Sequence, residues 1–257
     1  MAKKTNSQLN PLLLAAIALF LLVGGWLMKS LPIFLLVGYA PLFALTDSLN
    51  NKKPFWNQFE YILVVLGASF FAAHFFAGDQ LVLSIIQSII MTLPFVAYGF
   101  VYQALGNKTI KFTILFFWLA LEYALLKSPW RENWVFLADG ISLFSSLFTF
   151  TQHTGYLSIS VWLLVGNLFV YEMYFKENAF KVAYLIAFII WAGIPIGLKI
   201  GQSWQPLVHN DMMNLYAGTL TDNLMYNERG EWLGRTAAWI SVLIVVLSLV
   251  KNQIRKK

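Results

Sequence analysis

The sequence lacks cysteine altogether and has few charged residues. Without a thiol, the chain can form no disulfide, no thiolate nucleophile and no cysteine metal site. Charged residues make up 12% of the 257 positions, about half the fraction of an ordinary soluble domain, whereas 59% are hydrophobic. This combination favours an integral membrane protein over a soluble fold.

Several functional patterns are also absent. The chain has no His-Glu-x-x-His pair, no glycine-rich nucleotide loop and no internal repeat, and these are the usual signs of a zinc site, a nucleotide site or a solenoid. The net charge of +6 comes from basic residues scattered through short connectors, so it forms no stripe for nucleic acid. We therefore expect no metal, no cofactor and no nucleic-acid partner.

What the sequence does contain is a series of apolar runs. With about 20 apolar residues needed to cross a bilayer, the runs predict transmembrane helices at about 11–28, 31–46, 58–78, 80–104, 110–126, 156–175, 180–198 and 234–250. The first run has no convincing cleavage site, so we expect it to be retained. The second is short and contains Pro32 and Pro41, so a re-entrant hairpin with the first run is an alternative. The prediction is an all-α, polytopic, single transmembrane domain over 1–257.

The distribution of basic residues predicts the orientation. With a cytoplasmic N-terminus, twelve Lys and Arg residues fall on the cytoplasmic side and six on the other, out of 18 in all. The twelve are Lys3, Lys4, Lys52, Lys53, Lys108, Lys111, Lys176, Lys181, Lys251, Arg255, Lys256 and Lys257; the six are Lys29, Lys127, Arg131, Lys199, Arg229 and Arg235. Because basic residues are enriched in cytoplasmic loops, both termini are predicted to be cytoplasmic.

Two predicted outer segments, 127–155 and 201–234, are longer than a turn requires. The first includes an apolar stretch at 141–150, which is too short to span a bilayer and is more typical of an interfacial or re-entrant piece. The second is polar and mixed. These segments predict a pocket at the outer leaflet.

Glu122 is the leading candidate among the polar residues, because it lies near the outer end of the fifth predicted span. An ionised carboxylate in hydrocarbon costs a few kcal/mol and needs a partner. It is therefore a candidate for placing a substrate, together with Arg131. The alternative is a packing contact with Arg131 or Lys127 at the interface. Glu172, by contrast, has Lys176 four residues on, which predicts an ordinary helical ion pair.

The three histidines fall into two groups. His74 lies in a predicted span, where a contact between helices is the more common role. His153 and His209 lie in the outer segments, where a neutral imidazole can act as a general base. Asp211 is close enough in sequence to His209 to orient its ring. All three outer residues are candidate catalytic groups, although such pairs also arise by chance in loops.

One stretch resembles a known family. Its residues are Trp118, Glu122 and Tyr123, then Pro129 and Trp130, then Gln152, Gly155, Ser158, Val161 and Asn167. In this spacing they resemble the fifth and sixth spans of the bacterial apolipoprotein N-acyltransferase family. The end of the second run, Ala40-Pro41-Leu42, and the segment Glu228-Arg229-Gly230-Glu231-Trp232 before the last run are similar to that family too.

The resemblance implies an eight-helix domain in the bacterial inner membrane, with a groove open to the outer leaflet for phospholipid and lipoprotein. It implies lipid or substrate contacts for Trp118, Glu122, Trp130, Arg131, Gln152, Gly155, Ser158 and Asn167. The family also carries a nitrilase-like domain with a catalytic cysteine between its last two spans. Here only 201–234 occupies that place, and no cysteine exists, so the thioester mechanism does not transfer.

Three hypotheses follow. The first is a non-catalytic, acyltransferase-like scaffold that binds phospholipid or lipoprotein within an envelope complex, with a separate nitrilase-like polypeptide as a candidate partner. The second is an enzyme of lipid or lipoprotein acyl transfer that uses His153 or His209 as general base. The third, a transporter, is favoured only by Gly193, Pro195 and Gly197, which could break the seventh span. Gly155, Ser158 and Asn167 have a structural alternative, since small and polar residues let helices approach closely.

Overall fold

All the regular elements in the described part of the chain are helices. The computed structural model describes residues 9–50, 56–75, 81–105, 111–177, 179–200 and 232–256. The long helices are α1 (Pro11–Leu27), α2 (Ile33–Asn50), α3 (Trp56–His74), α4 (Leu81–Leu105), α5 (Thr113–Leu126), α7 (Leu157–Val170), α8 (Val182–Lys199) and α11 (Trp232–Lys256). The shorter elements are η3 (Arg131–Asn133), η4 (Leu137–Leu147), α6 (Thr151–Thr154) and η5 (Tyr171–Phe175), a π-helical turn that continues α7. The all-α prediction is confirmed, and each predicted apolar run holds one long helix.

Length and composition separate four of these helices from the rest. Leu81–Leu105, Leu157–Phe175, Val182–Lys199 and Trp232–Ile254 are long and apolar enough to cross a membrane, judged over the described residues. The remaining apolar stretches have 10–17 residues and are Pro11–Leu27, Ile33–Asp47, Phe59–His74, Thr113–Leu126 and Leu137–Leu147. The helix α5 has 14 residues, or about 21 Å at 1.5 Å per residue.

The helices run between two ends of the bundle. At the Lys111 end, Lys111 lies just before α5 and contacts Asp47 of α2, while Lys251 of α11 donates to the carbonyl of Leu105 at the end of α4. At the Glu122 end, Glu122 of α5 contacts Leu137 of η4. These contacts place the ends of α2, α4 and α11 together at the Lys111 end.

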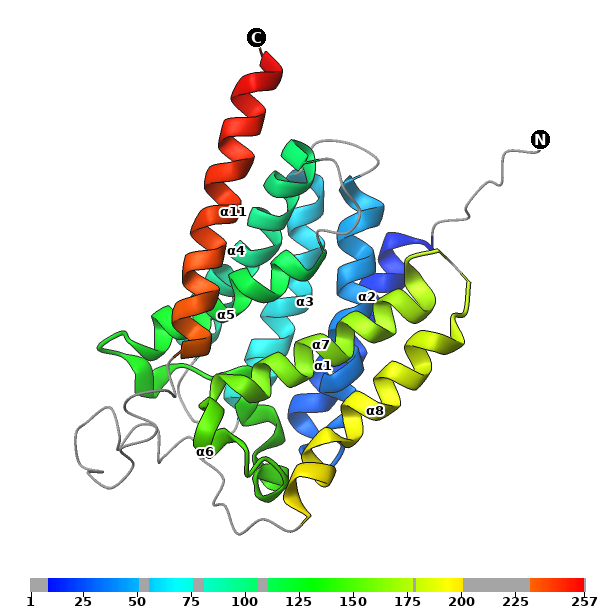
Figure 1. The fold of residues 1–257 in the computed structure, drawn as a ribbon, viewed down its shortest axis with the longest axis vertical. Helices are drawn as coiled ribbons and strands as arrows, with labels where there is room; N and C mark the ends of the chain where they lie inside the picture. Colours follow the sequence, from blue (N-terminus) through cyan, green and yellow to red (C-terminus); the bar gives the residue numbers. More distant parts are fainter. Residues whose placement is uncertain are drawn as a thin grey trace.

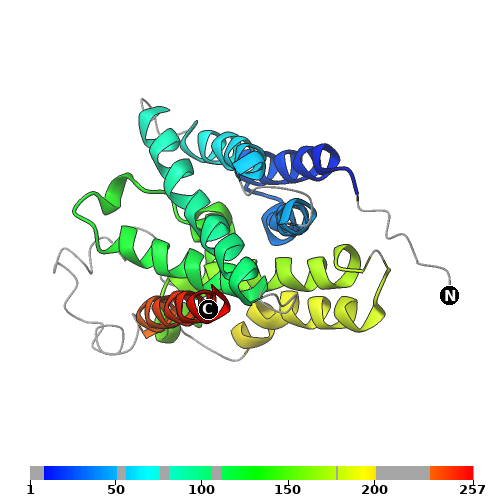
Figure 2. The ribbon, with the colours of Figure 1, turned by 90° about the horizontal axis from the view of Figure 1, so that it is seen from above.

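The remaining helices alternate between the same two ends. The Trp26 indole near the end of α1 donates to Ser69 near the end of α3, so α1 and α3 run in the same direction. Trp162, early in α7, contacts Trp191 in the second half of α8, so α7 and α8 are antiparallel. Figure 1 shows the resulting up-and-down arrangement, and Figure 2 shows α1 and α3 on one side of the bundle and α8 and α11 on the other. After the turn that follows α1, α2 runs back to the Lys111 end.

An aromatic cluster around Trp118 holds the centre of the bundle. Its ring lies 5.1 Å from that of Tyr39 on α2, 6.5 Å from that of Phe70 on α3 and 6.2 Å from that of Phe95 on α4. All four side chains are at most 2% exposed. Edge-to-face and offset aromatic pairs at these distances add to the stabilisation from burial, so α5 is fixed against three neighbours at once.

Candidate functional site: the Glu122 end

The Glu122 carboxylate is buried beneath the segment 127–155. Its Oε1 atom accepts a hydrogen bond of 2.9 Å from the backbone N–H of Leu137, and the residue is 2% exposed. Within the described residues Glu122 forms no ion pair with Arg131 or Lys127. The hydrogen bond from Leu137 ties the first residue of η4 to α5.

Three further polar groups surround this carboxylate without a hydrogen bond of normal geometry. The Trp118 indole N–H and the Ser160 hydroxyl lie close enough to interact with Glu122, and the Tyr39 hydroxyl is within electrostatic reach of it. In the described part of the chain, Tyr39 Oη, Trp118 Nε1, Glu122 Oε2 and Ser160 Oγ all lack a hydrogen-bond partner. Buried polar atoms are rarely left unpaired, so this cluster marks the polar centre of the Glu122 end.

The segment that covers Glu122 is attached to the bundle by its backbone. The Gln87 side chain on α4 accepts from Val135 N–H at 3.2 Å and donates back to the Val135 carbonyl. The same Gln87 oxygen lies 2.8 Å from His74 Nε2 on α3, which confirms His74 as a contact between helices. Asp139 accepts from the Phe136 N–H at 2.7 Å. The three consecutive backbone donors of 135–137 are thus bonded to the side chains of Gln87, Asp139 and Glu122.

The helix η4 packs against the turn between α1 and α2. Gly140 is buried, and a β-carbon at this position would collide with Leu35 and come within 3.2 Å of the Trp26 ring. Only a glycine lets the backbone approach so closely. The predicted apolar stretch is therefore a helical cap over the Glu122 end.

An apolar groove opens beside this cap. It has a volume of about 220 Å³ and lies between the start of α2, the end of η4, α7 and the second half of α8. Its lining residues carry only hydrocarbon or aromatic side chains and are Pro32, Ile33, Leu36, Phe144, Leu147, Phe148, Trp162, Ala192, Pro195 and Ile196.

Two tryptophans join α7 to α8, the two helices that form one wall of this groove. The Trp162 indole donates to the Trp191 carbonyl at 2.9 Å, and the Trp191 indole donates to the Trp162 carbonyl at 2.8 Å. The Trp191 carbonyl is available because Pro195, four residues later, has no N–H to bond to it. Pro195 thus leaves free the acceptor that joins α7 to α8.

Asn167 joins α7 to α2 at the middle of the bundle. Its side-chain oxygen accepts from the Tyr39 and Ala40 N–H groups at 2.7 and 3.0 Å, and its amide nitrogen donates to the Leu35 and Leu163 carbonyls at 2.8 Å. The side chain is completely buried. All four hydrogen-bonding positions of the amide are thus used within the protein, and this arrangement gives Asn167 a packing function.

The other sequence candidates are spread along the segment 127–155 and the start of α7. Trp130 is 66% exposed, and Arg131 is partly buried in η3. Gly155 ends α6 with a positive φ of 84°, a conformation that glycine adopts without strain, and the Ser158 hydroxyl donates to its carbonyl at 2.6 Å. These two residues therefore shape the turn between α6 and α7.

The histidine candidates are only partly described. Partly buried His153 lies in α6 next to Gln152, ahead of the turn into α7. His209 and Asp211 lie outside the described residues. Among the residues that are described, no three His, Asp or Glu side chains are grouped as a metal site would require.

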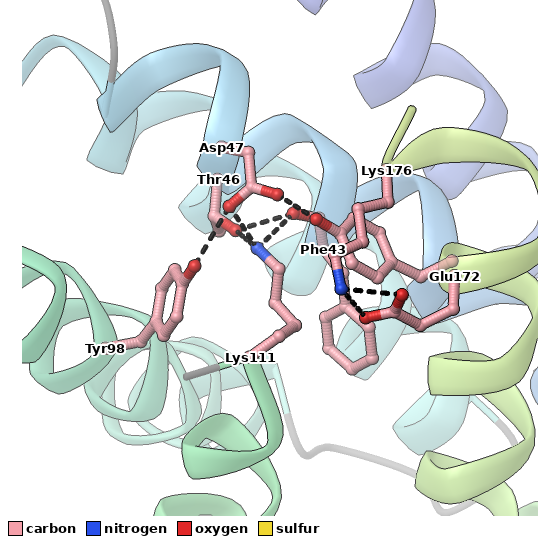
Figure 3. A network of polar contacts seen from close by, with 8 residues as sticks. Phe43, Thr46, Asp47, Tyr98, Lys111, Glu172 and Lys176 are labelled. Carbon is pink, nitrogen blue, oxygen red and sulfur yellow. Dashed lines mark hydrogen bonds and ion pairs between the residues drawn. The ribbon is translucent and has the colours of Figure 1, made fainter. Parts of the chain in front are cut away.

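A second polar network, at the Lys111 end, was not predicted from the sequence. The Lys111 ammonium donates to the Phe43 carbonyl, the Thr46 hydroxyl and the Asp47 carboxylate at 2.7, 2.7 and 2.6 Å. Tyr98 donates to the same carboxylate at 2.9 Å, and Tyr171 donates to it as well. Figure 3 shows these groups converging from α2, α4 and the start of α5, with Glu172 and Lys176 beside them.

This network is closed, because Lys111 uses all three of its N–H donors. Its ammonium also lies over the rings of Tyr98 and Tyr171, 4.3 and 4.9 Å from their centres. The neighbouring Glu172 and Lys176 form the predicted ion pair, at 2.6 Å. We assign this end a structural role and treat the Glu122 end as the candidate site.

Comparison with known proteins adds no assignment. No family model, no curated protein and no solved structure matches this chain.

Proposed function

We propose that the chain is a multi-pass protein of the bacterial inner membrane that holds an acyl chain of a phospholipid or lipoprotein at the outer leaflet. In this proposal it has eight spans, cytoplasmic termini and the role of a non-catalytic subunit of an envelope complex. The observation that carries the proposal is the apolar groove of about 220 Å³ at the Glu122 end. Hydrocarbon is the chemistry that such a lining accepts.

The outward faces of α8 and α11 support a bilayer environment. Pro195 is the only buried side chain along α8, and Ile186, Ile189 and Ile190 on this helix are 53 to 65% exposed. On α11, Trp239 and Leu247 are 71 and 62% exposed. A soluble monomer rarely exposes apolar faces of this extent, whereas lipid tails cover them without cost.

The charge distribution supports the orientation. The segments that connect or extend the helices at the Lys111 end contain twelve of the 18 basic residues. By the tendency of basic residues to stay in the cytoplasm, the Lys111 end is the cytoplasmic one. The Glu122 end, with the groove, then faces the outer leaflet.

The groove favours binding over catalysis. The walls of the groove are held in place by the paired Trp162 and Trp191 indoles and by η4. A lipid acyl chain would therefore enter a site that is largely preformed. The lining offers no nucleophile, and the whole sequence contains no cysteine. A scaffold that presents a lipid to a partner therefore accounts for the described geometry with fewer assumptions than an acyltransferase does.

The experiment is native mass spectrometry of the full chain purified in a mild detergent. We expect bound lipid on the wild type and on an Ala183→Trp control, which adds the same bulk at an exposed position of α8. Ala192→Trp, which fills the groove from the same helix, should lose the lipid. Equal lipid on Ala192→Trp and wild type would refute the groove, and a protein free of lipid and of protein partners would refute the scaffold.

A further inference from the structure

Two lysines lie within four residues of residues that line the groove. Lys199 ends α8, four residues after Pro195 and three after Ile196, both of which line the groove. Residues three and four apart share a face of a helix, so Lys199 lies on the groove side, one turn further out. On the opposite wall, Lys29 lies three residues before the lining residue Pro32.

Neither ammonium is paired with a carboxylate of the described residues. In the described part of the chain Lys29 and Lys199 form no ion pair and no side-chain hydrogen bond, whereas Lys111, Lys176 and Lys181 each pair with a carboxylate. Lys199 is exposed and Lys29 is partly exposed. Long lysine stems can follow an apolar wall while the charged ends reach the interface, so both charges are available to a group at the groove mouth.

We propose that the groove selects an anionic phospholipid, with one acyl chain inside it and the phosphate held between Lys29 and Lys199. This inference rests on the proposed function, because it adds a head-group preference to the same groove. Phosphate oxygens form strong, charge-assisted hydrogen bonds with ammonium groups. A zwitterionic head group carries its own cation, which competes with the two lysines, so a net negative lipid gains more from them.

The test compares phosphatidylglycerol and phosphatidylcholine of identical acyl chains, titrated onto the full chain in mild detergent and measured by native mass spectrometry. A lysine near an anionic lipid surface raises the binding affinity about fivefold. We expect the wild type to prefer phosphatidylglycerol and the preference to weaken with salt. Lys29→Gln/Lys199→Gln should bind both lipids equally, whereas Lys127→Gln, a matched charge loss at the same end outside the groove, should keep the preference.

The outcomes separate this inference from the proposed function. If Ala192→Trp keeps both lipids, the groove assignment fails. If Ala192→Trp loses both lipids but Lys29→Gln/Lys199→Gln keeps the wild-type preference, only the head-group inference fails. A wild type without preference would also overturn it, and so would displacement of phosphatidylglycerol by inorganic phosphate alone, since that would indicate a site for the free anion.

Discussion

The Asp47 carboxylate and the Lys111 ammonium lie 2.6 Å apart although 64 residues separate them in sequence. Lys111 is 2% exposed, and two tyrosines share its partner. The pair therefore joins α2 and the start of α5 at the end of the bundle opposite the groove.

We predict that Lys111→Met destabilises the protein by about 1–3 kcal/mol, because the Phe43 carbonyl and the 29% exposed Asp47 carboxylate lose their charged donor. The double variant Lys111→Met/Asp47→Asn should recover part of this loss, since no charge is then left unpaired. Thermal unfolding in detergent measures both effects. Additive losses in the double variant would show that the two charges are not coupled.

Asn167→Leu should cost about 1–3 kcal/mol, because it leaves buried backbone groups of α2 without their partner. The change preserves the approximate size of the side chain, so the loss reports on hydrogen bonds rather than on packing. Amide hydrogen exchange at Tyr39 and Ala40 should become faster in the variant. Unchanged exchange at both positions would mean that the Asn167 amide does not hold α2.

The glycines of α7 and α8 should respond in opposite ways to alanine. A β-carbon on Gly166 would collide with Leu36, so Gly166→Ala should destabilise the contact between α2 and α7 by about 1–3 kcal/mol. A β-carbon on Gly193 meets nothing within 4 Å. Gly193→Ala should therefore be neutral or stabilise by up to about 1 kcal/mol, since alanine is the better helix former. The midpoints of thermal unfolding of the two variants, measured in the same detergent, test this prediction. An equal decrease in both midpoints would contradict the packing of α7 on α2.

Glu122→Ala should destabilise the cap over the Glu122 end by about 1–3 kcal/mol, because the Leu137 N–H loses its acceptor. Glu122→Gln keeps an oxygen at the position of Oε1 and should remain closer to the wild type. Limited proteolysis within 127–155 reports directly on the cap. If both variants are cleaved at the wild-type rate, Glu122 does not anchor this segment.

The positions of the helices could be predicted because, in a chain with so few charged residues, apolar runs separated by polar connectors form few structures other than membrane helices. Each expected run coincides with a long helix to within a few residues. The partner role of Asp47 was missed for a simple reason: the predicted second span ended at residue 46, so this carboxylate fell in a connector. With α2 extending to Asn50, Asp47 lies within a long apolar helix, and a carboxylate in such a helix is expected to have a partner.

The candidate site was predictable only in its polar part. Glu122 stands out in sequence because a carboxylate within an apolar run is costly. The groove gives no such signal, since Phe144, Leu147 and Ala192 are ordinary apolar residues that meet only in the folded chain. The neighbouring bond from Trp162 to the Trp191 carbonyl likewise depends on the tertiary contact of α7 with α8.

The orientation of the Glu122 end is the claim on which the outer-leaflet function depends, and the absence of cysteine makes it directly measurable. Trp130 at the Glu122 end and Phe180 between η5 and α8 are 66 and 57% exposed, so each can be replaced by a single cysteine in an otherwise thiol-free chain. In spheroplasts treated with a membrane-impermeant maleimide, we expect Trp130→Cys to be labelled at once and Phe180→Cys only after permeabilisation. Labelling of Phe180→Cys in intact spheroplasts, with Trp130→Cys protected, would place the groove at the cytoplasmic leaflet and contradict the account.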